Sequence, residues 1–137
     1  MNVLDVFRIL NINSRSVEEA FLQHEQGGRY IHGWHTAWNN KKVYLRSSYE
    51  FDFAKELDEK KIEYDVEKIR ILYWDSQRFV FRTSIPDFYL PDTNTIVEIK
   101  STYTFEEQNM KDRFKAYREH GYKCKLILDH KEKEIIS

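Results

Sequence analysis

Three charged residues stand at the ends of two short apolar segments of this chain. Asp87 comes just before the apolar residues 88–90, and Glu98 and Lys100 close the segment 96–100. A charged side chain in a strand that looks buried is costly unless it is paired or binds a metal. The three residues are therefore either the solvated end of a hairpin, with a salt bridge worth little, or parts of a site.

Their spacing favours a site for phosphodiester chemistry. A turn over residues 91–94 would pair the two segments as an antiparallel hairpin and bring Asp87 and Glu98 to the same end. Glu98 and Lys100 are two residues apart, so they share one face of a strand. Two carboxylates and a neighbouring backbone carbonyl suit Mg²⁺, for which Mn²⁺ can substitute. The lysine could position or deprotonate an attacking water.

The same residues carry a resemblance to a known family. The Pro-Asp pair that ends at Asp87, followed by the Glu-Ile-Lys that ends at Lys100, resembles the signature of the PD-(D/E)xK nuclease superfamily. Around residues 44–50 the chain is also similar to small phage- and intron-associated endonucleases of the homing type. The resemblance covers residues 46–128. It implies a restriction-endonuclease-like core and a Mg²⁺-dependent DNA endonuclease that leaves a 5′-phosphate.

Glu50 is a further candidate for the catalytic and metal site. The family often places an acidic residue on its first core helix, and the resemblance assigns Glu50 to that position. Tyr49, Phe53 and Leu57 are spaced i, i+4, i+8 and predict an inward face, at whose edge Glu50 lies. The alternative is a capping box, in which Ser47 caps the helix and Glu50 reaches back to it.

The elements that must position these residues predict an α/β (mixed α+β) fold. We expect a central mixed sheet of four to five strands flanked by helices, preceded by an N-terminal helical hairpin within residues 3–25 whose outline fits a helix-turn-helix. The charged tail over residues 129–137 is expected to be frayed. The predicted helices are 48–60 and 104–120, and the predicted strands are 66–74, 78–83, 87–90, 95–99 and 122–128.

The sequence ahead of the core predicts contacts with DNA. We expect residues 1–45 to form a helical, basic DNA-contacting region and residues 46–137 to form the nuclease core. Residues 26–48 interleave basic and aromatic side chains and contain no Asp or Glu, which suits phosphate and base contacts. The alternative is an extended flap pinned by Trp34 and Trp38. The candidate DNA-contacting residues are Arg29, Lys41, Lys42, Arg46, Lys111 and Lys115.

Each of the basic candidates also has an ordinary interpretation. Arg46 could pair with an acid instead of a phosphate, and Lys111 and Lys115 could belong to a solvated helix face. His32 and His35 lack a cysteine or a third ligand nearby, which disfavours a zinc site.

The composition limits which class of protein this chain can belong to and in which cell compartment it is expected. The net charge of −1 argues against a histone-like binder and allows a local basic surface. The single cysteine rules out an internal disulfide and a cysteine-based zinc cluster. The first residues lack a signal-peptide pattern, and no apolar run is long enough to span a membrane. We expect a soluble protein of the cytoplasm, in a bacterial or phage-infected host cell, with no membrane partner.

Double-stranded DNA is the expected partner. A cut through both strands requires two sites and therefore a homodimer, whereas a nickase can be a monomer. Two other functions stay open at this point. One is a non-catalytic DNA-binding subunit on a nuclease-like fold, and the other is a structure-specific nuclease that acts on junctions or mismatches.

Overall fold

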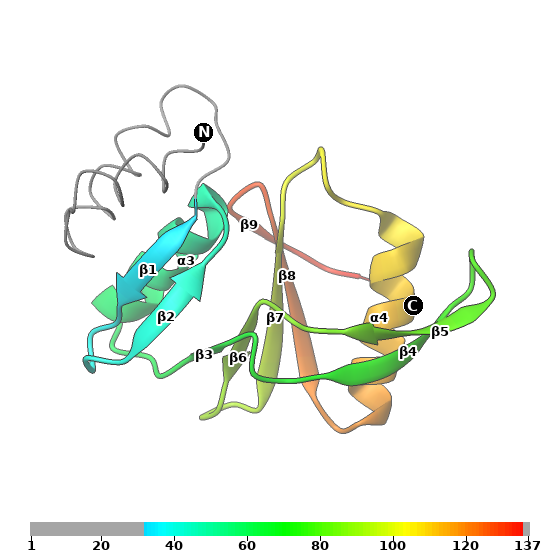
Figure 1. The fold of residues 1–137 in the computed structure, drawn as a ribbon, viewed down its shortest axis with the longest axis horizontal. Coiled ribbons are helices and arrows are strands. Elements are labelled where there is room, and N and C mark those ends of the chain that lie inside the picture. The colour runs from blue at the N-terminus through cyan, green and yellow to red at the C-terminus, as the bar shows by residue number, and fades with distance from the viewer. Residues whose placement is uncertain (1–31, 136–137) are drawn as a thin grey trace, which may run out of the picture. The chain divides into compact units, whose positions relative to one another are not determined.

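The computed structural model of the chain, drawn in Figure 1, describes residues 32–135. The chain separates into two compact units between Ile62 and Glu63, and each unit is described by itself. The predicted helical hairpin within residues 3–25 and the candidate Arg29 lie outside the described residues. The division into a DNA-contacting region (1–45) and a nuclease core (46–137) is a functional one and stays a prediction.

In the first unit, β1 (Gly33–Thr36) and β2 (Lys42–Leu45) form an antiparallel hairpin. The turn between them contains Asn40 with a φ of 68°, a left-handed conformation that asparagine tolerates better than most residues. Burial alternates along β2, as in a half-buried strand, because Val43 and Leu45 are buried and Lys42 is exposed. The segment that could have been an extended flap pinned by Trp34 and Trp38 is therefore a regular β-hairpin over residues 33–45.

The predicted helix over residues 48–60 is confirmed as α3 (Ser48–Glu59). Ser47 is its N-cap, and the Ser47 hydroxyl accepts a hydrogen bond from the amide of Glu50 at 3.2 Å. Phe51 and Leu57 are on the buried face, together with Glu50 itself, whereas Phe53 is only half-buried. The inward face is therefore rotated slightly from the predicted one.

The second unit contains a five-stranded mixed sheet, as predicted. Strands β7 and β8 are parallel, and every other neighbouring pair in the sheet is antiparallel. The parallel pair is joined by the crossover helix α4 (Glu107–Glu119). The strands, in their order across the sheet, are β3 (Asp65–Val66), β6 (Phe88–Leu90), β7 (Thr95–Lys100), β8 (Lys123–Leu128) and β9 (Lys131–Lys133).

Two predictions for the secondary structure of this unit were wrong. The single strand predicted over 66–74 is two strands, β3 and β4 (Ile71–Asp75), because Glu67 has a φ of 51° that breaks the extended backbone. β4 pairs with β5 (Val80–Ser84) as a separate two-stranded hairpin. The tail predicted to be frayed contains β9, which extends the sheet by pairing with β8.

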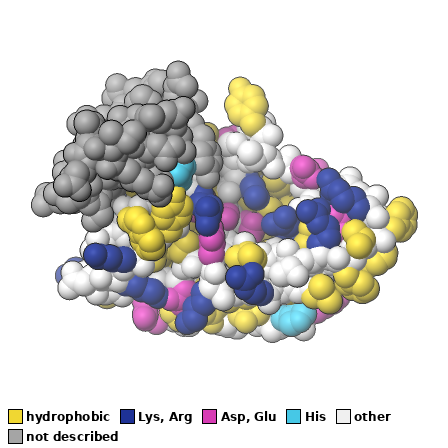
Figure 2. Space-filling model, in the orientation of Figure 1, with side chains coloured by type: hydrophobic (Ala, Val, Ile, Leu, Met, Phe, Trp, Pro, Cys, Tyr) yellow, Lys and Arg dark blue, Asp and Glu magenta, His cyan; other side chains and the backbone are white. Residues whose placement is uncertain are grey.

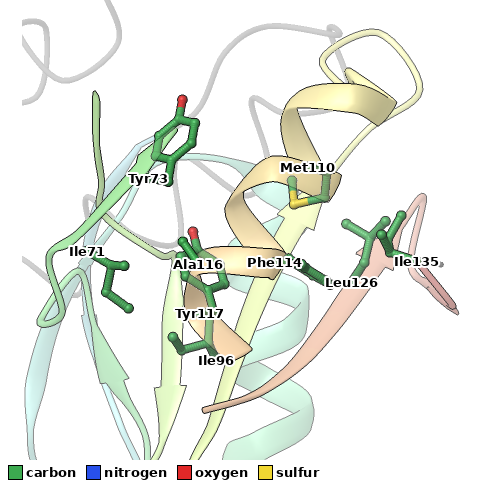
Figure 3. Packing of buried hydrophobic residues seen from close by; sticks show 9 residues of the cluster. All are labelled: Ile71, Tyr73, Ile96, Met110, Phe114, Ala116, Tyr117, Leu126 and Ile135. Atoms are coloured by element: carbon green, nitrogen blue, oxygen red, sulfur yellow. The ribbon is translucent and has the colours of Figure 1, made fainter. Parts of the chain in front are cut away.

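The core of the second unit lies between α4 and its surrounding strands. Figure 3 shows nine buried residues of this cluster. They come from β4, β7, α4, β8 and the segment after β9: Ile71, Tyr73, Ile96, Met110, Phe114, Ala116, Tyr117, Leu126 and Ile135. Because β4 packs one face against α4, the opposite face of its hairpin leaves Leu72, Trp74 and Phe81 exposed.

Helices α3 and α4 contain 12 and 13 residues, and a membrane span requires roughly 20. No helix within residues 32–135 is both long and apolar enough to cross a membrane.

Candidate active site

The pairing of β6 with β7 brings Asp87 and Glu98 together. Phe88 pairs with Val97, so one further step along the antiparallel register sets Asp87 opposite Glu98. The Oδ2 atom of Asp87 accepts a hydrogen bond from the amide of Ile99 at 2.8 Å. The hairpin geometry expected from the sequence is therefore present, and the chemical role of the two acids stays a prediction.

Helix α4 closes over Glu98. The carboxylate is only 1% exposed, and the Tyr117 hydroxyl donates to its Oε1 atom at 3.1 Å. The Ser84 hydroxyl is hydrogen-bonded to the Tyr117 hydroxyl, so Ser84 donates to Tyr117 when Tyr117 donates to Glu98. The Oε2 atom lies 3.9 Å from Nη1 of Arg113, which is long for a hydrogen bond.

The ionised forms of both carboxylates are disfavoured, that of Glu98 by burial and by the neighbouring charge of Asp87. Burial, and next the charge of Asp87, raise the pKa of Glu98 to about 8, against the lowering effect of Lys100 and Arg113. Burial also raises the pKa of Asp87 above its usual value, with Lys100 acting in the opposite direction. Two carboxyl groups held close in a poorly hydrated place do not both ionise readily near neutral pH, and a cation would favour their ionised forms. The donor set therefore fits a divalent metal ion.

Lys100 and Glu67 complete the charges around this pair. Lys100 ends β7 two residues after Glu98 and is half-buried. Glu67 raises the pKa of Asp87 through its charge, and its amide donates to the Asp87 backbone carbonyl at 3.2 Å. Within residues 32–135 no three His, Cys, Asp or Glu side chains gather as a complete metal cage. Two carboxylates remain compatible with Mg²⁺, which keeps several of its waters.

Glu50 is engaged in its own helix cap. Its carboxylate accepts from the Ser47 hydroxyl at 3.3 Å and from the Arg46 amide at 3.4 Å, so it reaches back to the helix start as in a capping box, but to the amide before Ser47 instead of the Ser47 amide. Glu50 belongs to the first unit, and its assignment as a catalytic and metal-binding residue stays a prediction.

The candidate DNA-contacting residues are distributed over both units. In the first unit Lys42 and Arg46 are exposed, Lys41 is half-buried, and the Arg46 guanidinium lies 5.2 Å from the centre of the Tyr44 ring. On α4, Lys111 lies 4.0 Å from Glu107, and Lys115 is exposed. Their contact with DNA stays a prediction.

The two histidines considered for zinc have protein partners. His32 is hydrogen-bonded to the Tyr44 hydroxyl, and Nε2 of His35 lies 2.6 Å from Oδ2 of Asp58.

The sequence did not identify the residues that α4 contributes around Glu98. Neither Tyr117 nor Arg113 was assigned to the site from the sequence. The available signal was their i, i+4 spacing, which puts both on one face of α4, together with the rule that a crossover helix packs onto the strands it connects.

Comparison with known proteins adds no relative, because no family model, no curated protein and no solved structure matches this chain. Function is therefore argued from the geometry and chemistry of the site.

Proposed function

We propose that this chain is a metal-dependent endonuclease that hydrolyses phosphodiester bonds of double-stranded DNA, of the homing type used by phages or mobile elements. One observation carries the proposal. Asp87 and Glu98 lie opposite each other on paired strands, and burial, followed by the charge of Asp87, raises the pKa of Glu98 to about 8. A structural carboxylate gains nothing from such a neighbour, whereas a cation site does.

Each residue of the site has a role in this reaction. Asp87 and Glu98 would hold Mg²⁺ or Mn²⁺, which when bound neutralises phosphate charge and makes water a better nucleophile. The hydrogen bond from Tyr117 to Oε1 of Glu98 fixes the orientation of the carboxylate that would help to hold the ion. Lys100 orients the attacking water, whose oxygen bonds to phosphorus while the P–O3′ bond breaks. The products are a 5′-phosphate and a 3′-hydroxyl, to which the water proton is passed.

The mode of cleavage sets the assembly. An enzyme that cuts both strands needs two sites and would act as a homodimer, and one that nicks would act as a monomer. The cytoplasm of a bacterial or phage-infected cell is the compartment that fits a DNA substrate.

One observation favours a second candidate, a non-catalytic DNA-binding subunit on a nuclease-like fold. Glu98 is 1% exposed and already accepts a hydrogen bond from Tyr117, as a structural acid would. The two candidates differ in one outcome, because only the enzyme loses a reaction when the carboxylates are changed.

Cleavage of supercoiled plasmid in Mg²⁺ or Mn²⁺ tests the proposal, with the wild type compared to Asp87→Asn and Lys100→Met. We expect metal-dependent nicking or linearisation that falls roughly 100-fold or more in both variants, because Asp87→Asn removes the charge of a metal-holding group and Lys100→Met removes the group that orients the water. Asp92→Asn is the matched control, since Asp92 is exposed in the turn at the other end of the same hairpin. A wild type that shifts DNA on a gel but cuts neither linear, supercoiled nor branched DNA supports the binding subunit.

A further inference from the structure

A basic pocket lies beside the candidate active site, within the second unit. It has a volume of about 230 Å³ and lies between the β4–β5 hairpin, the end of β7 and α4. Four of its lining residues are cationic, and Glu106 is the one acid that the described residues contribute to its wall. Figure 2 shows Lys and Arg side chains gathered over the part of this unit that carries the hairpin and α4. The four cations are Arg78, Arg82, Lys100 and Arg113.

A buried acid holds two of these arginines in place. Asp75 has no exposed surface, and its Oδ2 atom lies 3.1 Å from Nη1 of Arg78 and 3.2 Å from Nη1 of Arg82. Its Oδ1 atom accepts from the amides of Gln77 at 3.1 Å and Arg78 at 3.0 Å. One carboxylate thus orients two guanidinium groups and balances only one of their charges.

The remaining hydrogen-bonding capacity of the arginines is available to a ligand. Their side chains are 54% and 46% exposed. Each guanidinium has five N–H donors in a planar fork that matches phosphate geometry. The side-chain hydrogen bonds to Asp75 use one nitrogen of each arginine. The pocket therefore presents fixed, partly solvated donors for an anion with several oxygens.

The position of the pocket identifies the anion. Lys100 lines it and also belongs to the candidate active site, and Arg113 lines it while contacting Glu98. A ligand in the pocket is consequently next to the phosphate that the proposed enzyme would cut. We propose that the pocket binds a neighbouring backbone phosphate of the same DNA strand, with Arg78 and Arg82 as its anchors. The inference rests on the proposed function only in identifying the anion as DNA.

The salt dependence of DNA binding tests this assignment. Anisotropy of a labelled duplex is measured over a range of salt, with Ca²⁺ in place of Mg²⁺, for the wild-type chain and the double variant Arg78→Gln/Arg82→Gln. Loss of one phosphate contact lowers the slope of log K against log salt by about 1. The control is Lys123→Gln. Lys123 is exposed and lies at the end of β8 away from Lys100, so its removal should leave the slope unchanged. A double variant with the wild-type slope overturns the inference.

A second variant guards against misfolding. Removing both arginines strands the buried charge of Asp75, which is strongly unfavourable. The triple variant Asp75→Asn/Arg78→Gln/Arg82→Gln removes that charge as well, and its asparagine oxygen still accepts from the two backbone amides. We expect the triple variant to retain a cooperative thermal transition and to show the same loss of slope. A folded triple variant with wild-type salt dependence also overturns the inference.

The outcomes separate this inference from the proposed function. A wild type that cuts DNA while the arginine variants keep the wild-type slope supports the nuclease and rejects the pocket. An arginine-dependent slope in a protein that cuts no DNA supports the pocket and rejects the nuclease. A parallel titration with inorganic phosphate tests the other source of the anion. If the arginine variants lose phosphate binding but keep the DNA slope, the assignment to DNA is wrong.

Discussion

Two buried carboxylates of the second unit, Asp75 and Glu98, have opposite electrostatics. Burial raises the pKa of Glu98 to about 8, and the next contribution is the neighbouring acid Asp87. Burial also opposes the charge of Asp75, but hydrogen bonds from Arg78, Arg82 and Gln77 prevail and hold its pKa below the usual value. One acid is thus fully satisfied by its fold, and the other is left with an unfavourable charge.

The comparison indicates what each acid does. Asp75 holds a turn and two arginines in place through its hydrogen bonds, so its role is structural. Glu98 has one hydrogen bond from Tyr117 and a long contact to Arg113, and these do not offset its burial beside Asp87. Acids whose ionised form is disfavoured by the fold are typical of functional sites.

The largest predicted effect is a loss of folding stability as the pH rises from acidic to alkaline values. The pKa of Glu98 is about 8 in the folded protein and 4.5 by default, so the unfolded chain ionises first and stability falls as the pH rises between these values. The metal-free wild type should lose on the order of 4 kcal/mol between about pH 5 and pH 9. Glu98→Gln should lose much less, measured by urea unfolding. A wild type that gains stability over this range would contradict the assignment.

A smaller effect is predicted for Tyr117→Phe. The change removes the hydrogen bond to Glu98 and leaves the Ser84 hydroxyl without its partner, at a cost of roughly 1–3 kcal/mol. Because that hydrogen bond lowers the pKa of Glu98, its removal raises the folded pKa further, so the loss of stability with rising pH should be larger and continue to higher pH. Tyr89→Phe is the matched control, since its hydroxyl bonds to the exposed Asn94 and should change stability little. Equal effects of the two substitutions would refute the role of Tyr117.

The smallest effect is predicted for Asp75→Asn, and it has the opposite sign in pH. The lowered pKa of Asp75 stabilises the fold above the unfolded pKa of 3.8, and this contribution is lost as the pH falls through the folded value. The variant should lack this acid-sensitive part of the thermal stability, and its arginines, being half-exposed, return to water. Thermal unfolding from acidic to neutral pH, with Asp92→Asn as control, measures it. An unchanged acid limb would show that Asp75 is not a charged anchor.

The sequence predicted the acids of the site better than their surroundings. Asp87 and Glu98 could be placed because a four-residue turn and the alternation of a strand determine a local hairpin, as the register of β6 and β7 confirms. The Ser47 cap of α3, one of the two alternatives considered for this segment, could be proposed for the same reason. Local hydrogen bonds and spacing carry enough information for both.

The residues around those acids depend on packing between distant segments. Tyr117 and Arg113 face Glu98 only because α4 crosses over the sheet, and Arg78 and Arg82 line the pocket only because β4 leaves the strand predicted over 66–74. That departure follows from one backbone conformation, the positive φ of Glu67, which glutamate adopts rarely. No hydrophobic periodicity in the sequence predicts this backbone conformation at Glu67.

Calorimetric titration of the metal-free protein with Mn²⁺ near neutral pH tests the central claim most directly, when it is repeated in buffers of different ionisation enthalpy. Because Glu98 has a pKa of about 8 and a bound cation requires its ionised form, each ion should release about one proton. Asp87→Asn should abolish binding, and Asp92→Asn should leave both binding and proton release intact. Binding without proton release, or equal binding by Asp87→Asn, would contradict the account.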